Sequence, residues 1–138
     1  MSEPQMGLDA PALYAALAEK EKVKGHHSPE GRAIRVMTRA LDGWSAGSVS
    51  AADVVILCDQ AVEDWLKARL QVPLWLERNL PALLPTALEK NLISGDEAEG
   101  LRTIHDLRSR LRAALGHACA EDAERTLELC IRIVERCW

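Results

Sequence analysis

Apolar residues recur every three or four positions through most of this chain of 138 residues. That spacing places them along one face of an α-helix, whereas the alternation of apolar and polar residues that is typical of half-buried strands is scarce. The longest apolar stripe follows Ser50 and consists of Val54, Leu57, Cys58, Ala61, Trp65 and Ala68. The pattern predicts an all-α fold, namely an up-down bundle of four to five main helices with an additional short N-terminal helix.

The additional short helix is expected in the amino-terminal part of the chain, before the bundle. After a disordered tail, Asp9 and Pro11 provide a helix cap and an early proline, which together predict a short helix. Gly25 then interrupts the pattern. We therefore expect residues 1–27 to form a tail and a short helix, and residues 28–138 to form the helical bundle.

Capping signals mark the main helices. Serine and early proline favour a helix start, whereas glycine commonly ends a helix and proline prevents its continuation. These signals predict helices that begin after Ser28, Ser50 and Ser94 and at Glu121, and that end at Gly43, Pro73, Gly116 and Trp138. A loop is expected at 45–49. In the leucine-rich segment 74–91, Pro81 and Pro85 can each begin or kink a helix.

The composition limits both the size of the fold and its partners. Hydrophobic residues make up 48% of the chain and charged residues 28%, which suits one domain with a single core. The net charge of −4 argues against a protein coated with positive charge, so any contact with nucleic acid requires a local basic patch. We expect neither a signal peptide nor a membrane span, because the longest aliphatic run is Val54–Leu57.

The cysteine and histidine pattern does not favour a metal site. Four cysteines lie far apart without a C-x-x-C motif, and this predicts free thiols in a reduced, cytoplasmic protein rather than a disulfide or a zinc site. His26 and His27 are adjacent, but they lack two further ligands at a recognised spacing, so a solvated loop is favoured there. We expect no metal and no cofactor.

Segment 101–117 combines basic residues with a histidine on an otherwise apolar helix. It contains one acid, Asp106, against four arginines, namely Arg102, Arg108, Arg110 and Arg112. Such a concentrated positive strip suits a phosphodiester. On a regular helix Arg110 and His117 lie on one flank, whereas Arg112 and His117 point about 140° apart. Gly116 is expected to end the helix and to let His117 turn back toward Arg112.

Arg112 and His117 supply the groups needed to cleave RNA without a metal. When the ribose 2′-hydroxyl attacks the neighbouring phosphate, a histidine can transfer the proton because its side chain titrates near neutral pH. An arginine stabilises the developing charge, since its planar guanidinium binds two phosphate oxygens. In the alternative interpretation, the histidine only binds carbonyl groups at the helix end and the arginines are only solvated.

A second motif lies on the long helix that follows Ser50. Within residues 60–70, the chain matches the pattern E-x-x-L-K-A-x-L at Glu63, Leu66, Lys67, Ala68 and Leu70. Together with the later capped helix that ends in R-x4-H, this segment resembles the HEPN domain (higher eukaryotes and prokaryotes nucleotide-binding), a family of small all-α bundles. The resemblance covers residues 28–138.

The resemblance implies a function and a set of partners. Active HEPN proteins are metal-independent endoribonucleases, many of which serve as toxins or in phage defence beside a nucleotidyltransferase-type antitoxin. They typically form homodimers in which two Arg-His pairs face each other across one cleft. The matched positions here are Arg112 and His117 as catalytic residues, and we expect Arg108 or Arg110 to assist in binding the RNA phosphate.

One position departs from the family pattern. Ala113 follows the arginine where HEPN proteins usually have a polar residue, and alanine cannot orient the catalytic groups by a hydrogen bond. The family also contains non-catalytic members. The alternative hypothesis is therefore an inactive HEPN-like module that dimerises and binds a protein or nucleotide partner.

The remaining histidine and the tryptophans suit structural roles. His105 projects to the edge of the apolar stripe, which favours a partly buried, structural position. Trp65 and Trp138 have core spacing, so packing is the favoured interpretation for both. Trp44 and Trp75 lie near helix ends and are the two that suit an interface.

Overall fold

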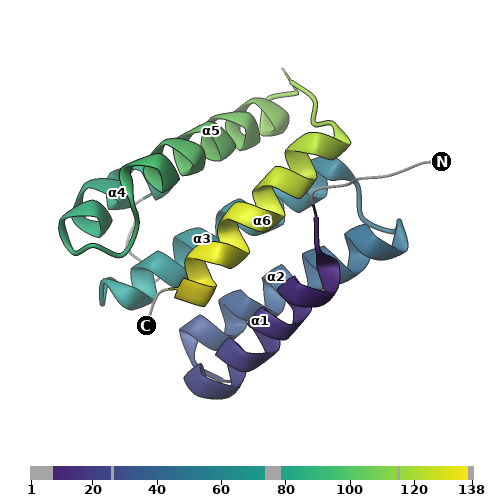
Figure 1. Cartoon of the computed structure of the whole chain (residues 1–138). Helices are drawn as coiled ribbons and strands as arrows, with labels where there is room; N and C mark the ends of the chain where they lie inside the picture. The colour runs from purple at the N-terminus through teal and green to yellow at the C-terminus, as the bar shows by residue number, and fades with distance from the viewer. Residues whose placement is uncertain (1–7, 26, 74–78, 115, 137–138) are drawn as a thin grey trace.

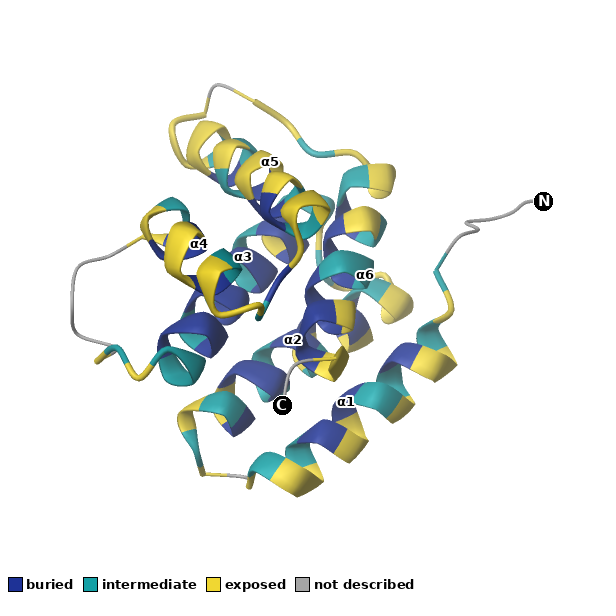
Figure 2. Cartoon of the chain, turned by 60° about the vertical axis from the view of Figure 1, so that its left-hand side comes forward, coloured by how far each residue is buried: buried dark blue, intermediate teal, exposed yellow. Residues whose placement is uncertain are grey.

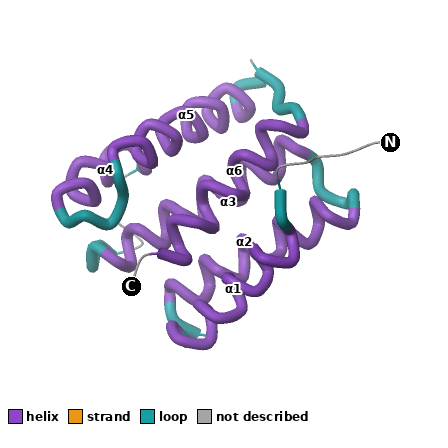
Figure 3. Tube along the Cα trace, in the orientation of Figure 1, coloured by secondary structure: helices purple, strands orange, loops and turns teal. Residues whose placement is uncertain are grey.

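The computed structural model describes residues 8–25, 27–73, 79–114 and 116–136. It contains six helices, α1 (Ala10–Lys24), α2 (Pro29–Ala46), α3 (Ala51–Arg69), α4 (Leu80–Glu89), α5 (Gly95–Arg112) and α6 (Ala120–Arg136) (Figure 1). The described residues contain no strand (Figure 3). The prediction of an all-α helical bundle is thereby confirmed.

Helix α3 is the centre of the bundle. It contacts α2, α4, α5 and α6, and α6 covers one of its faces (Figure 1). Helices α2 and α5 lie on opposite sides of α3 and make no contact with each other. The buried faces of the helices point toward a shared apolar core (Figure 2). Trp65 is fully buried in this core, which confirms its predicted packing role.

Serine side chains begin three of the main helices, as the sequence predicts. Ser28 and Ser50 accept hydrogen bonds from backbone N–H groups in the first turns of α2 and α3. Ser94 forms a complete capping box, in which its side chain accepts from the Glu97 N–H and the Glu97 side chain accepts from the Ser94 N–H. These bonds satisfy donors that the first turn of a helix leaves free.

The predicted end of α2 is wrong by three residues. Gly43 lies inside the helix, which continues to Ala46 and ends at Gly47 with a φ of 74°. A Cβ atom at Gly43 would lie 2.1 Å from the Val49 side chain. Glycine therefore stands at position 43 because the chain packs against it, and the predicted loop at 45–49 starts later than expected.

Two further helix ends differ from the prediction for a common reason. Helix α5 ends at Arg112 rather than near Gly116, and α3 ends at Arg69 rather than at Pro73. In both cases a non-glycine residue adopts the left-handed conformation just after the helix, Ala114 in one and Gln71 in the other, each with a φ of 59°. This conformation is costly for residues with a Cβ atom, so sequence rules do not place a helix end there.

The remaining predictions concern the two prolines, the cysteines and the tryptophans. Pro81 is the second residue of α4, and Pro85 lies within the helix. Cys58 and Cys130 are buried free thiols, whereas Cys119 is an exposed one. Trp44 is half-buried, and its indole N–H donates to Glu124 at 3.3 Å. Several predictions fall on residues outside the described ranges, namely those for the tail at 1–7 and for His26, Trp75, Cys137 and Trp138. No helix in the described ranges has the length and apolar character that crossing a bilayer requires.

Candidate functional site at the carboxyl end of α5

Arg112 and His117 both lie on the surface near the carboxyl end of α5. Arg112 is the last helical residue, and its side chain is exposed. Ala113 follows as the C-cap, and the left-handed Ala114 then redirects the chain. His117 lies exposed in the segment that leads to α6.

The segment after Arg112 folds back along α5. A Cβ atom at Gly116 would lie 3.2 Å from the Cβ atom of Arg110, so the backbone at Gly116 packs directly against the last turn of the helix. His117 follows immediately. The chain thus turns back at Ala114 rather than at Gly116, where the reversal was predicted, and Gly116, the residue before His117, lies beside Arg110.

Asp122 lies close to His117 at the start of α6. Its carboxylate accepts hydrogen bonds from the Cys119 backbone N–H at 3.0 Å and from the Cys119 thiol at 3.3 Å. The backbone N–H of Cys119 is the main cause that lowers the pKa of Asp122, and the charge of His117 contributes to the same shift.

Arg108 does not share this surface, because its side chain is buried between α5 and α3. It forms an ion pair with Asp59, which has 0% exposure, and it donates to the Gln60 side chain at 3.1 Å. Glu63 lies 4.0 Å away. The guanidinium that was expected to assist phosphate binding is thus engaged inside the protein.

His105 completes this buried cluster. Its side chain is 17% exposed, and its Nδ1 lies 3.3 Å from the Asp59 carboxylate oxygen that Arg108 also contacts. The partly buried position agrees with the prediction from the helical pattern. The second Asp59 oxygen, Oδ1, has no hydrogen-bond partner within the described ranges. The sequence shows that Asp59 lies within an apolar stripe, but it does not show that Arg108 and His105 are the partners of this carboxylate.

Arg110 is exposed, yet it has an acidic neighbour. Its guanidinium lies 3.6 Å from Asp106, one turn earlier on α5. Three further exposed arginines are paired in the same way with acids on their own helices, in the pairs Arg102–Glu99, Arg125–Glu121 and Arg132–Glu128, and Arg136 of α6 pairs with Glu97 of α5. The positive strip that the sequence predicts is therefore partly neutralised.

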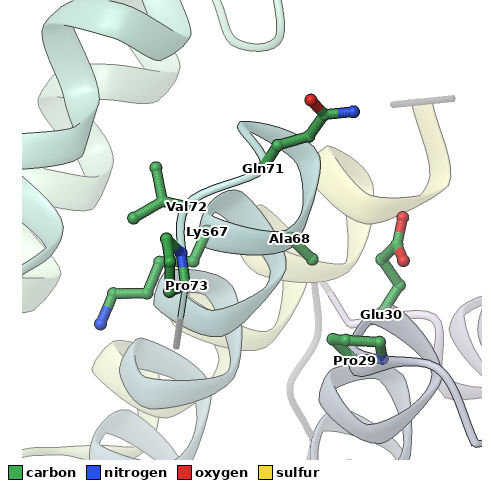
Figure 4. A pocket seen from close by; sticks show the side chains of 7 residues that line it. All are labelled: Pro29, Glu30, Lys67, Ala68, Gln71, Val72 and Pro73. Carbon is green, nitrogen blue, oxygen red and sulfur yellow. The ribbon is translucent and has the colours of Figure 1, made fainter. Parts of the chain in front are cut away.

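Two pockets lie away from the Arg112–His117 end. One of about 330 Å³ is lined by the first turn of α2 and by the end of α3, including Glu30 and Lys67 (Figure 4). Lys67 pairs with Glu63 at 3.4 Å. The other, of about 150 Å³, lies between α5 and α6 and is mainly apolar, with Leu107 and Leu129 in its lining. Neither pocket includes Arg112 or His117 in its lining.

The described residues contain no group of three or more His, Cys, Asp or Glu side chains that is arranged to hold a metal ion. Comparison with protein-family models, with curated proteins and with solved structures found no match.

Proposed function

We propose that this chain is an HEPN-like endoribonuclease that cleaves RNA without a metal, with Arg112 and His117 as its catalytic residues. The observation that carries the proposal is the chain reversal after α5. It holds an exposed histidine close to the end of the helix whose last residue is an exposed arginine. An arginine and a histidine near one another are the minimum for metal-independent transesterification.

The proposed reaction uses each group in one role. His117 accepts the proton of the ribose 2′-hydroxyl as this oxygen attacks the adjacent phosphorus. Arg112 binds the non-bridging oxygens, on which charge accumulates. The 5′-oxygen leaves with a proton from solvent, which gives a 2′,3′-cyclic phosphate and a 5′-hydroxyl.

The family resemblance extends the proposal to assembly and biological role. We propose that two copies form a homodimer, in which their Arg112–His117 pairs line one cleft. The role would be that of a toxin or defence component in the cytoplasm, controlled by a nucleotidyltransferase-type antitoxin. A cleft between two copies also accounts for the open, exposed position of both residues in the single chain.

Two observations favour a second candidate, a non-catalytic module that binds a protein partner or a nucleotide. Ala113 is exposed and presents a methyl group where the family usually has a polar side chain. The apolar pocket between α5 and α6, lined by Leu107 and Leu129, offers a surface for an apolar side chain of a partner.

Cleavage of RNA in EDTA distinguishes the two candidates. Purified protein is incubated with single-stranded and structured RNA, and the ends of the products are analysed. We expect 2′,3′-cyclic phosphate ends and a loss of rate of at least about 10²-fold in His117→Ala and in Arg112→Ala. Arg132→Ala is the matched control, because it removes an exposed arginine from α6. Equal inactivity of the wild type and all variants would favour the non-catalytic module.

The departure at Ala113 provides an independent test. Ala113→Asn restores a polar side chain at an exposed position with an ordinary φ of −85°. We expect cleavage to become faster, on the order of tenfold, because an oriented catalytic group reacts more efficiently. A variant that stays at the wild-type rate would show that the polar residue is not what limits this site.

A further inference from the structure

The face of α3 that is turned away from α6 is polar and lies between α2 and α5. Gln60 and Asp64 are half-buried there, one turn apart, and the Gln60 amide donates to Asp64 at 3.1 Å. The Gln60 carbonyl oxygen accepts from Arg108 of α5. Cys58 and Cys130, by contrast, meet on the side of α3 that α6 covers. We call the first surface the α2–α3–α5 face.

Cations from three helices surround Asp64 on this face. Lys67 of α3, Arg32 of α2 and Arg108 of α5 each act electrostatically on its carboxylate. Asp64 therefore lies between the flanks of α2 and α5, although these helices do not contact each other. Packed helices lie about 8–10 Å apart, so the axes of α2 and α5, which both pack on α3, are separated by at most about 20 Å.

Exposed arginines continue along both flanks. Arg39 is seven residues after Arg32 on α2, and Arg112 is seven residues after His105 on α5. Residues seven apart point in nearly the same direction and lie about 10 Å apart along the axis. Each flank thus carries two basic residues separated along the helix axis, Arg32 and Arg39 on α2 and His105 and Arg112 on α5. Arg112 lies at the carboxyl end of α5, which His117 follows.

These arginines differ from those on the opposite side of the molecule. Within the part of the chain that the structure describes, neither Arg39 nor Arg112 makes a hydrogen bond or an ion pair. Arg32 donates only to the His27 carbonyl oxygen, at 3.4 Å. On α6, Arg125 and Arg132 are both paired with acids of the same helix. Among the arginines that the structure describes, the three without an ion pair, Arg32, Arg39 and Arg112, therefore lie on the flanks of the α2–α3–α5 face.

We propose that the α2–α3–α5 face binds the phosphate backbone of single-stranded RNA, with Arg32 and Arg39 as contacts, and leads the strand toward Arg112 and His117. The inference rests on the proposed function and adds the path of the substrate. Charge complementarity selects the occupant, because unpaired guanidinium groups on two flanks match a chain of phosphates. The half-buried Asp64 lies among these cations and weakens their attraction for phosphate.

Binding of a fluorescent single-stranded RNA oligonucleotide tests the proposal. The His117→Ala protein is used so that the RNA stays intact, and affinity is measured in EDTA at several salt concentrations. We expect the added pair Arg32→Gln and Arg39→Gln to weaken binding at least tenfold. Each phosphate contact contributes about 0.7 to the slope of log affinity against log salt for a single strand, so the slope falls by about 1.4.

The matched control is the added pair Arg125→Gln and Arg132→Gln, which removes the same charge from α6. We expect its affinity to change less than twofold. Asp64→Asn is expected to tighten binding several-fold, because it removes a carboxylate from among the cations. Circular dichroism confirms that each variant is folded.

The outcomes separate this inference from the proposed function. Equal losses in the α2 and α6 variants, or a wild-type affinity in the α2 variant, overturn the inference even if RNA is cleaved. Absence of RNA binding also overturns it. If the α2 variant alone binds weakly while the unmodified protein cleaves no RNA, the binding face stands and the catalytic proposal fails.

Discussion

Arg108 and Arg112 lie one turn apart on α5, yet they have opposite surroundings. Arg108 is buried against Asp59 of α3, whereas Arg112 is exposed at the last residue of the helix. Arg108 is held by the carboxylate of Asp59, which would otherwise be buried without a partner. Arg112, by contrast, is available to a ligand. The comparison shows that a basic helix is not a uniform surface, because its packing partners decide which cations remain accessible.

The largest expected effect is on the buried side of this comparison. Arg108→Ala should lower the free energy of unfolding by about 3–5 kcal/mol, because it leaves the Asp59 carboxylate buried without its main partner. Urea denaturation followed by circular dichroism measures the change. A loss below about 1 kcal/mol would mean that the pair is solvated and that the contrast with Arg112 is wrong.

A double variant checks the cause of that loss. Arg108→Met combined with Asp59→Leu replaces both charges with apolar groups, and we expect it to recover most of the lost stability. The unsatisfied Oδ1 of Asp59 favours this outcome, since an incompletely hydrogen-bonded carboxylate is costly in a core.

The next effect sharpens the exposed side. Ala114→Gly should raise the free energy of unfolding by about 0.5–1 kcal/mol, because the residue has a φ of 59°, which glycine adopts without strain. Ala113→Gly is the matched control, since Ala113 has a φ of −85° and gains nothing from glycine. Equal effects at both positions would show that the turn after Arg112 carries no strain. Thermal denaturation compares the two variants.

A smaller, pH-dependent effect distinguishes Asp64 from Asp122. Burial raises the pKa of Asp64, although the Gln60 amide opposes the shift, whereas the Cys119 backbone N–H lowers the pKa of Asp122. The stability that Asp64 contributes therefore falls as the pH rises from about 3.9 through its folded pKa. Across that pH range, Asp64→Asn should become more stable than the wild type. Asp122 contributes stability above about pH 3.9, which is lost as the pH falls through its folded pKa, so Asp122→Asn should be less stable near neutral pH. Melting temperatures between pH 3 and 7 measure both, and shifts of the same sign would contradict this assignment.

The smallest expected effect returns to Arg112. Arg112→Ala should change the free energy of unfolding by less than about 0.5 kcal/mol, because the side chain is exposed at a helix end. Denaturation under the conditions used for Arg108→Ala gives the direct comparison. A loss above about 1 kcal/mol would place Arg112 in the buried cluster and remove the basis for its catalytic role.

Much of the fold was predictable because the signals that begin a helix are local. The side chains of Ser28, Ser50 and Ser94 each bond a backbone N–H within their own first turn, so the sequence alone locates these starts. Helix ends were predicted less well. Gly43 accommodates the Val49 side chain inside α2, and Ala114 takes a conformation that its residue type disfavours.

The candidate site divides in the same way. The sequence by itself determined the all-α pattern, the basic character of α5 and the presence of an arginine five residues before a histidine, because these properties follow from residue type and helical spacing. Only the tertiary structure decided that Arg108 is buried by Asp59, a partner 49 positions away, while Arg112 and Arg39 stay accessible. The physical reason is that ion pairs and burial depend on which helices pack together, and helical periodicity specifies a face without specifying what covers it.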